Sequence, residues 1–292
     1  MVRNLRADTA NPMPLVAIVT GAGGGIGRAL SQSLAERGYR VVLGDRCEAS
    51  LTATLQTLPP PALGELWLAD VVDETAWQTL AEQLIARGET VGLLVNCAGV
   101  LLAGRLADSP ASELRRVVEV NLLGAMFGCR AMAPLLAAAA PTTRPASPSA
   151  PPLPIGVLNV ASIFAPLAPP GFAAYNASKA GLVTLTQTLR GEWGPLGMTA
   201  TAVLPGITRT GLFKTGSYTA DRLAEAVTSR GDQGTLSAEF VARESLRAYA
   251  LRREIAPIGR RAGLRYRLLH WLPGVVRSRV RRDANRLLEE SS

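Results

Sequence analysis

A tyrosine and a lysine lie four residues apart in residues 174–180, a stretch that we expect to form a helix. Side chains at this spacing share one helical face, so the Tyr175 phenol and the Lys179 ammonium can approach each other. Because a nearby cation favours phenolate, we expect it to lower the phenol pKa towards the range of an acid–base catalyst. Lysine is scarce, with Lys179 and Lys214 among 31 basic residues. An ordinary surface helix is the alternative reading.

A glycine-rich loop follows the first apolar run of the chain. Residues 15–19 predict a strand, residues 20–28 contain Gly21, Gly25 and Gly27, and a helical pattern comes next. Such a loop lets backbone N–H groups and a helix N-terminus approach a pyrophosphate. The spacing departs from G-x-G-x-x-G because Ile26 takes the place of the last glycine. A plain tight turn is the alternative.

An acidic residue ends the second predicted strand. Asp45 follows residues 39–43, and an acid about 20 residues beyond a glycine loop is where a ribose 2′-hydroxyl is held. Since a carboxylate repels a 2′-phosphate, we expect NAD, with NADP less favoured, although Arg46 could offset that preference. Alternatively, Asp45 caps the helix that starts near Glu48.

Strand and helix patterns alternate along most of the chain. The predicted strands are residues 15–19, 39–43, 64–68, 91–95, 155–160 and 199–204. This alternation predicts an α/β fold with right-handed crossovers, a single Rossmann-like doubly wound parallel sheet with helices on both faces. Asn121 interrupts an apolar helix and is expected to be buried and hydrogen-bonded. Ser162 follows the fifth strand.

Composition excludes several classes of protein. The chain has 292 residues, 48% of them hydrophobic, and no apolar run approaches the ~20 residues of a membrane span. The N-terminus has no secretory apolar core, so we expect a cytoplasmic protein. Cys47, Cys97 and Cys129 predict reduced, buried thiols and no metal site. A single histidine, His270, excludes a His-based triad and is expected to pack.

The positive charge belongs to the C-terminal part. The formal charge is +8, and residues 252–286 hold eleven arginines against Glu254 and Asp283. An apolar stripe accompanies these arginines at helical spacing: Leu264, Leu268, Trp271, Leu272, Val275 and Val276. We expect this basic amphipathic helical extension to pack against the domain or a second subunit, or to lie on an anionic membrane as a peripheral contact. No nucleic-acid partner is expected.

Three parts of the chain follow from these patterns. They are an N-terminal arm (1–13), the sheet domain (14–256) with a proline-rich insertion (139–154), and the basic helical tail (257–292). The insertion precedes the fifth strand, at the edge of the sheet away from the expected site, and so should leave the chemistry intact. We expect residues 214–234 to form a mobile lid, and Ser237 to cap the helix that follows.

Taken together, residues 14–212 resemble the short-chain dehydrogenase/reductase family. The resemblance lies in the glycine loop, in Asp70, in Asn96-Cys97-Ala98-Gly99 with Cys97 replacing the usual second asparagine, and in residues 205–210. It implies a catalytic set of Ser162, Tyr175, Lys179 and Asn121. It implies cofactor contacts from Gly21, Gly25, Ile26, Gly27, Asp45, Arg46, Asp70, Val71, Asn96, Ala98, Gly99, Tyr175, Lys179, Pro205, Gly206, Thr208 and Thr210.

The resemblance also assigns roles. Tyr175 would exchange a proton with the substrate oxygen, Ser162 would hold that oxygen, Lys179 would bind the nicotinamide ribose, and Asn121 would position a water. We therefore expect an NAD-dependent oxidoreductase that forms a homodimer or homotetramer. The alternatives are an NADP-dependent carbonyl or 3-oxoacyl-thioester reductase and, in another class, a non-catalytic dinucleotide-binding or membrane-associated scaffold.

The residues expected near the substrate are apolar. Besides Ser162 and Tyr175 they are Phe164, Leu212 and Phe213, with Val100, Leu101 and Ile163 close by. These side chains favour a hydrophobic secondary alcohol or ketone, steroid-like or lipid-derived, over a sugar. Ordinary packing is the other reading of the same residues.

Overall fold

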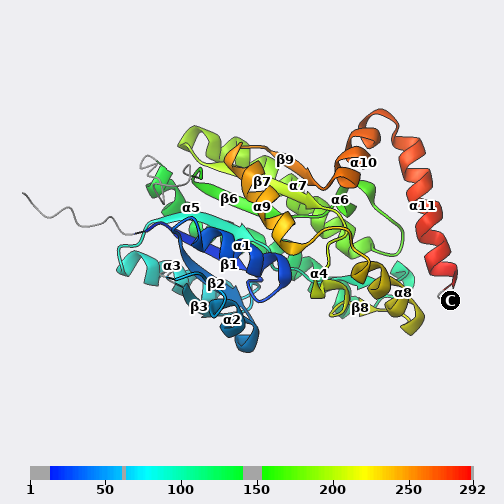
Figure 1. The fold of residues 1–292 in the computed structure, drawn as a ribbon, viewed down its shortest axis with the longest axis horizontal. Helices are drawn as coiled ribbons and strands as arrows, with labels where there is room; N and C mark the ends of the chain where they lie inside the picture. The colour runs from blue at the N-terminus through cyan, green and yellow to red at the C-terminus, as the bar shows by residue number, and fades with distance from the viewer. Residues whose placement is uncertain (1–13, 61–63, 141–152, 291–292) are drawn as a thin grey trace, which may run out of the picture.

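The computed structural model describes residues 14–60, 64–140 and 153–290. The predicted N-terminal arm and residues 141–152 of the proline-rich insertion lie outside these ranges. The described residues form one seven-stranded sheet with helices around it (Figure 1).

All seven strands of the sheet run parallel, in the order β3-β2-β1-β4-β6-β7-β9. Their bounds are β1 Val16–Thr20, β2 Arg40–Asp45, β3 Gly64–Leu68, β4 Val91–Asn96, β6 Gly156–Val160, β7 Thr199–Pro205 and β9 Ile255–Ile258. The six predicted strands are confirmed to within two residues at each end. β9 was missed, and the expected domain limit at residue 256 falls inside it.

Helices cover both faces of the sheet. The helices that cover the sheet include α1 Gly25–Ala35, α2 Glu48–Leu55, α3 Glu74–Ala86, α5 Gly124–Ala139, α7 Ala173–Trp193 and α9 Ala238–Ala250. The connection through α1 leads from β1 towards the β3 edge of the sheet, whereas the connections through α3, α5 and α7 lead towards the β9 edge. Right-handed crossovers therefore place α1 on one face of the sheet and α3, α5 and α7 on the other. α9 joins β7 to β9 in the same direction as α3, α5 and α7 but packs beside α1 (Figure 1), so this last crossover departs from the expected right-handed rule. The Ser237 hydroxyl caps α9, as expected, by accepting the Phe240 N–H.

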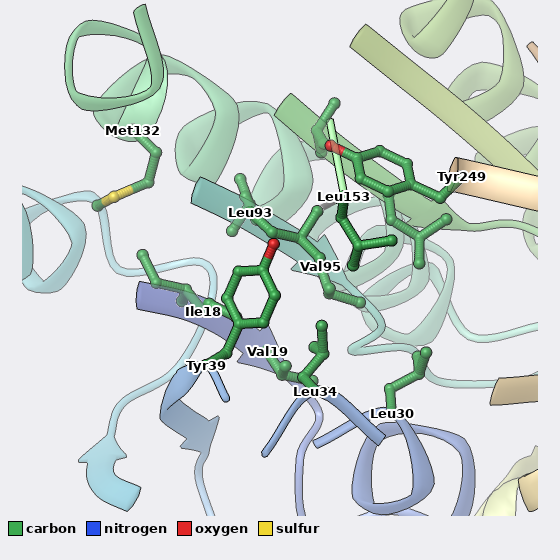
Figure 2. Close-up of a cluster of buried hydrophobic side chains, with 14 of the residues drawn as sticks. Ile18, Val19, Leu30, Leu34, Tyr39, Leu93, Val95, Met132, Leu153 and Tyr249 are labelled. Atoms are coloured by element: carbon green, nitrogen blue, oxygen red, sulfur yellow. The ribbon is translucent and has the colours of Figure 1, made fainter. Parts of the chain in front are cut away.

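The central strands are buried on both faces. Ile18 and Val19 of β1 and Leu93 and Val95 of β4 are fully buried and lie together in the core (Figure 2). Strands covered on both faces show continuous apolar runs, which explains why the alternation of strands and helices could be predicted from the sequence. This core holds the carboxyl ends of the strands in fixed positions at one edge of the sheet.

A long helical run precedes β6. α4 Ala111–Val118, a π-helical turn Glu119–Leu123 and α5 follow one another without a break. By length and composition the 29 residues Ala111–Ala139 could cross a membrane, with a mean hydropathy of 1.6 in their most apolar window. The expectation that no apolar segment approaches that length was therefore wrong. In the described structure α5 packs on β4 and α3, which accounts for its apolar composition.

Two helices form the C-terminal extension, α10 Arg260–Trp271 and α11 Pro273–Glu290. Ala262, Val276 and Val280 pack against Ile163 and Leu167, next to the short helix α6 Phe164–Leu167. The helical tail is thus confirmed, and part of it packs on the domain.

Most of the predicted apolar stripe does not pack on the domain. Leu264, Leu268, Trp271, Leu272 and Val275 are exposed, and Val276 alone of the six side chains joins an apolar cluster. The exposed side chains of α10 lie opposite its packed face, because two positions along an α-helix correspond to about 200° of rotation. His270 is also exposed and contacts the Trp271 ring, so its expected packing role was wrong.

Candidate active site

A cavity of about 490 Å³ follows the carboxyl ends of the central strands. The chain turns from one half of the sheet to the other between β1 and β4, and open α/β sheets bind ligands at such a switch point. The cavity contains both the glycine loop and the Tyr175–Lys179 face of α7.

The glycine loop passes very close to the end of β4. Gly21 has φ +65°, and a Cβ there would lie 2.8 Å from the Ala98 backbone; a Cβ on Gly27 would lie 2.1 Å from the Gly21 carbonyl oxygen. The Thr20 hydroxyl accepts the N–H groups of Cys97 and Ala98 at 3.0 and 3.1 Å. Larger side chains at Gly21 or Gly27 would therefore push the loop away from the cavity.

The N-terminus of α1 opens onto this cavity. Gly24 is its N-cap, and within the described chain no side chain caps the helix and no acid lies in its first turn. Gly24, Gly25, Ile26 and Gly27 line the cavity. Uncapped N–H groups at the positive end of a helix suit an anionic pyrophosphate, so this part of the site fits a dinucleotide.

Two carboxylates also line the cavity. Asp45 accepts the N–H groups of Gly23 and Cys47, each at 3.2 Å, and it lines the cavity together with Arg46. The N-cap of α2 is Cys47, so the alternative role of Asp45 as the helix cap is not what the structure shows.

The second carboxylate follows β3. Asp70 accepts the N–H of Val72 at 3.2 Å, and both Asp70 and Val71 line the cavity.

Tyr175, Lys179 and Ser162 are buried together beside the cavity. Lys179 Nζ lies 6.0 Å from the centroid of the Tyr175 ring and donates to the Val160 carbonyl at 2.9 Å. The Ser162 hydroxyl accepts the Phe164 N–H at 3.1 Å, and its side chain lowers the pKa of the neighbouring Tyr175 phenol. The helical spacing and the strand end therefore bring the three groups to one place.

Burial sets the protonation of this pair. It raises the pKa of Tyr175 to about 12, and this effect outweighs the lowering by the neighbouring Ser162 side chain. It also lowers the pKa of Lys179 to about 8. The expected lowering of the tyrosine pKa was thus wrong for the protein alone, because the spacing argument weighed the cation and left out desolvation, which disfavours both charged forms.

Asn121 lies within the π-helical turn and is 1% exposed. It is buried and hydrogen-bonded, as expected. Its side-chain oxygen accepts the Val100 N–H at 2.8 Å, and its amide group donates to the Val100 carbonyl at 3.0 Å and to Ser178 at 3.1 Å. Ser178 lies in α7 between Tyr175 and Lys179. Asn121 therefore ties the loop after β4 to the helix that holds the buried pair.

Asn96 differs from the other predicted cofactor residues because it lies outside the cavity lining. Its amide donates to Asn159 at 2.9 Å, and Asn159 donates to Thr186 at 2.8 Å. This buried chain links β4, β6 and α7. The other predicted cofactor residues all line the cavity: Gly21, Gly25, Ile26, Gly27, Asp45, Arg46, Asp70, Val71, Ala98, Gly99, Tyr175, Lys179, Pro205, Gly206, Thr208 and Thr210.

The three cysteines are free, and no disulfide joins them in the described chain. Cys129 is buried and Cys97 partly buried, whereas Cys47 is exposed, which corrects the expected burial of all three. Cys47 follows β2 at the sheet edge, where the chain leaves the core.

Apolar side chains form the end of the cavity beyond Tyr175. Phe164, Leu212 and Phe213 line it, with Val100 and Leu101. The Phe164 ring meets the rings of Phe172 and Tyr175 edge-on, at 5.2 and 6.2 Å between centroids.

The residues expected to form a lid lie beside this end. They contain β8 Ser217–Tyr218 and α8 Asp221–Asp232, and β8 pairs with β5 Leu102–Ala103. Leu288 of α11 packs on the same apolar cluster. The C-terminal extension thus supports the wall of the cavity.

Residues 15–220 match the family model described as short chain dehydrogenase. The chain belongs to the short-chain dehydrogenase family. The sequence resemblance to this family is thus confirmed.

Similar proteins agree with this membership. Carbonyl reductase family member 4 of Danio rerio is 32% identical over 201 residues, which cover 68% of this chain and 77% of the relative. Probable oxidoreductase EphD of Mycobacterium tuberculosis strain H37Rv is 29% identical over 95% of this chain, which spans 47% of the relative's length. A short chain dehydrogenase/reductase from Burkholderia phymatum, solved in complex with NAD, is 28% identical with a TM-score of 0.74 over 88% of this chain and 95% of its own.

Several cavity residues of this dehydrogenase were not singled out from the sequence. Most of them follow directly on a strand or on a residue that was predicted. They are Gly23, Gly24, Ser50, Ala69, Val120, Val160, Ala161, Ile207, Gly211 and Thr215. Their position just past the carboxyl ends of the strands was a usable signal, because that edge of an α/β sheet forms the binding crevice.

The lowered pKa of Lys179 predicts a pH-dependent stability. The Lys179 pKa is about 8 in the folded chain and 10.5 as its ordinary value. Between these two pH values the unfolded chain binds the lysine proton more readily than the folded chain, so the free energy of unfolding rises with pH. Relative to Lys179→Met, the wild-type free energy of unfolding should gain about 1–2 kcal/mol between about pH 7.5 and about pH 9.5. Urea titrations across this range measure the difference.

The matched control is Lys214→Met, because Lys214 is exposed beside Asp232. Its stability curve should run parallel to that of the wild type. A parallel curve for Lys179→Met as well would contradict a lysine held with a lowered pKa.

Proposed function

We propose that this short-chain dehydrogenase transfers a hydride between NAD and a hydrophobic secondary alcohol or ketone. The observation that carries the proposal is the single cavity that joins the glycine loop and Asp45 at one end to Tyr175, Ser162 and Lys179 at the other. One end suits an adenosine diphosphate, and the other holds proton-transfer groups beside apolar side chains.

Tyr175 is the proposed acid and base. During alcohol oxidation the phenolate oxygen accepts the hydroxyl proton as the hydride leaves the adjacent carbon, and during reduction the phenol returns that proton. Ser162, which lines the same cavity beside Tyr175, is proposed to hold the substrate oxygen within reach of the phenol. The nicotinamide, when bound, supplies the hydride acceptor or donor.

Lys179 and Asn121 support the tyrosine. The Lys179 ammonium, anchored on the Val160 carbonyl, is proposed to bind the nicotinamide ribose and to stabilise phenolate. A Cβ on Gly99 would lie 3.3 Å from the Asn121 oxygen and 3.4 Å from Lys179 Nζ, so both groups flank the same backbone position. This proximity supports the proposal that Asn121 positions a water that carries the proton away from Lys179.

Asp45 is the proposed selector of NAD over NADP. Its carboxylate lies beside the glycine loop, where it can accept a ribose 2′-hydroxyl and would repel a 2′-phosphate. The NAD complex of the Burkholderia phymatum relative supports the same choice. Arg46, exposed at the edge of the cavity, is the observation that keeps an NADP-dependent carbonyl reductase as the second candidate.

The substrate class follows from the lining beyond Tyr175. Phe164, Leu212 and Phe213 offer no hydrogen bonds from their side chains. The hydroxyl groups of a polyol would therefore lose their hydrogen bonds to water there and form none with these side chains. A steroid-like or lipid-derived substrate would bury its apolar body there. A cytoplasmic location and a homodimer or homotetramer stay predictions from the sequence.

Turnover on a substrate panel tests the proposal. With NAD, we expect kcat/KM for cyclic and long-chain secondary alcohols to exceed that for sugar alcohols of similar size by at least about tenfold. The control is the same panel with NADP. Faster turnover with NADP would favour the second candidate, and binding of NAD with no turnover of any panel member would favour a dinucleotide-binding scaffold.

A further inference from the structure

An exposed apolar surface lies where α10 meets α11. We call it the apolar corner, and it consists of Leu264, Leu268, Trp271, Leu272 and Val275. Thirteen large apolar side chains are exposed in the described chain, and these five fall within twelve consecutive residues. Trp271 is 80% and Val275 66% exposed. Contiguous exposed apolar surface of this kind marks a site of interaction.

The apolar corner is not the packing face of these helices. α10 packs on the domain through Ala262, Tyr266 and Leu269, and α11 through Val276 and Val280. On α10 the corner residues lie about 200° of rotation from that face. α10 therefore has two apolar faces, and one of them is already covered by the domain.

Arginines surround the corner. Those within the two helices up to residue 282 are Arg260, Arg261, Arg265, Arg267, Arg277, Arg279, Arg281 and Arg282. All eight are exposed, and none of them forms an ion pair with another described residue. No acid occurs between Glu254 and Asp283. The corner is thus apolar, and the helical segments that carry it hold eight arginines and no acid before Asp283.

A groove of about 910 Å³ borders the corner between α9 and α10. Its charged lining residues are Arg247, Arg253, Arg260, Arg261, Arg267 and Glu244. Leu264 of the corner lines the groove as well. A guanidinium-lined groove that continues into apolar surface matches the chemistry of a phospholipid, in which an anionic phosphate adjoins acyl chains.

We propose that the apolar corner and its arginines bind an anionic phospholipid membrane. Trp271, Leu272 and Val275 enter the boundary between headgroups and acyl chains, while the arginines contact the phosphates. A second copy of this chain fits less well, since a twofold interface would bring identical clusters of arginine together without acids to neutralise them. The proposal does not depend on the substrate of the enzyme.

Vesicle flotation of the full chain tests the proposal. We expect binding to vesicles of phosphatidylglycerol and phosphatidylcholine in equal parts, weak binding to pure phosphatidylcholine, and release by high salt. Trp271→Ser combined with Leu272→Ser should weaken binding to the anionic vesicles by at least about tenfold. Arg260→Gln, Arg261→Gln and Arg267→Gln together should reduce the salt dependence.

The matched control combines Leu106→Ser with Leu196→Ser. These leucines are 59% and 54% exposed, against 52% for Leu272, and they lie outside α10 and α11. The control should bind vesicles as the wild type does. Unchanged thermal unfolding and unchanged turnover of both double variants would show that the fold is intact.

Tryptophan fluorescence gives a second readout. Trp77 and Trp193 are buried and Trp67 is half-buried, so Trp271 is the exposed tryptophan of the described chain. Quenching by lipids with brominated acyl chains should therefore be seen in the wild type and be lost in Trp271→Ser.

Three outcomes would overturn the proposal. They are equal binding to neutral and anionic vesicles, no binding to either, and loss of binding in the control. If the corner variant instead changes the sedimentation velocity of the protein without affecting vesicle binding, the corner is an interface between copies of the chain.

Discussion

Replacing Tyr175 by phenylalanine should lower kcat for alcohol oxidation by between about a hundredfold and about 10⁴-fold, the contribution of one positioned acid–base group. The ring still packs against Phe164, so affinity for the cofactor should change by less than about twofold and the fold should persist. Stopped-flow turnover and cofactor titration measure the two quantities on the same sample.

The pH profile separates proton transfer from simple disruption. Because burial raises the pKa of Tyr175, the phenol must lose its proton before it can accept one from an alcohol. Wild-type oxidation should therefore accelerate as pH rises, and the residual activity of Tyr175→Phe should lose that dependence on pH.

Tyr39→Phe is the matched control. Tyr39 is also buried, its pKa is likewise raised to about 12 by burial, and its hydroxyl has no hydrogen-bond partner in the described structure. It precedes β2, at the edge of the sheet opposite to the cavity. Its replacement should leave kcat unchanged. An equal loss of activity in both variants, or full activity in Tyr175→Phe, would refute the assignment of Tyr175.

The sheet and the heart of the site were predictable for physical reasons. Strands such as β1 and β4 are buried on both faces, so they appear as apolar runs that end in glycine or small polar residues. Helical spacing brought Tyr175 and Lys179 together, and the end of β6 brought Ser162 beside them. These relations are local or follow from parallel strands sharing one edge.

Features that depend on tertiary packing were missed. β9 is four residues long, contains Pro257 and has a strand neighbour only at β7, so its sequence carries no strong alternation. The tail periodicity showed an apolar face but could not show that another face of α10, through Ala262, Tyr266 and Leu269, packs on the domain beside α6. The raised tyrosine pKa is a desolvation effect, which spacing alone does not report.

Replacing Asp45 by asparagine should shift cofactor preference strongly. Asparagine keeps an oxygen that can accept the Gly23 N–H, now accepted at 3.2 Å, but it removes the charge that would face a 2′-phosphate. Two charges near 4 Å at a protein surface interact by about 4 kcal/mol before screening. Part of that repulsion is lost to solvent, so the ratio of kcat/KM for NAD to that for NADP should fall by about 10- to 100-fold.

Asp70→Asn distinguishes selection from general weakening of cofactor binding. Asp70 also follows a strand and accepts a local N–H, from Val72. The family resemblance implies that Asp70 contacts the adenine, which NAD and NADP share. Its replacement should weaken NAD and NADP alike and leave their ratio nearly unchanged. If Asp45→Asn likewise leaves the ratio unchanged, Asp45 serves to hold the glycine loop through Gly23, and Arg46 is then the next residue to replace, because a guanidinium beside the 2′-position would favour NADP.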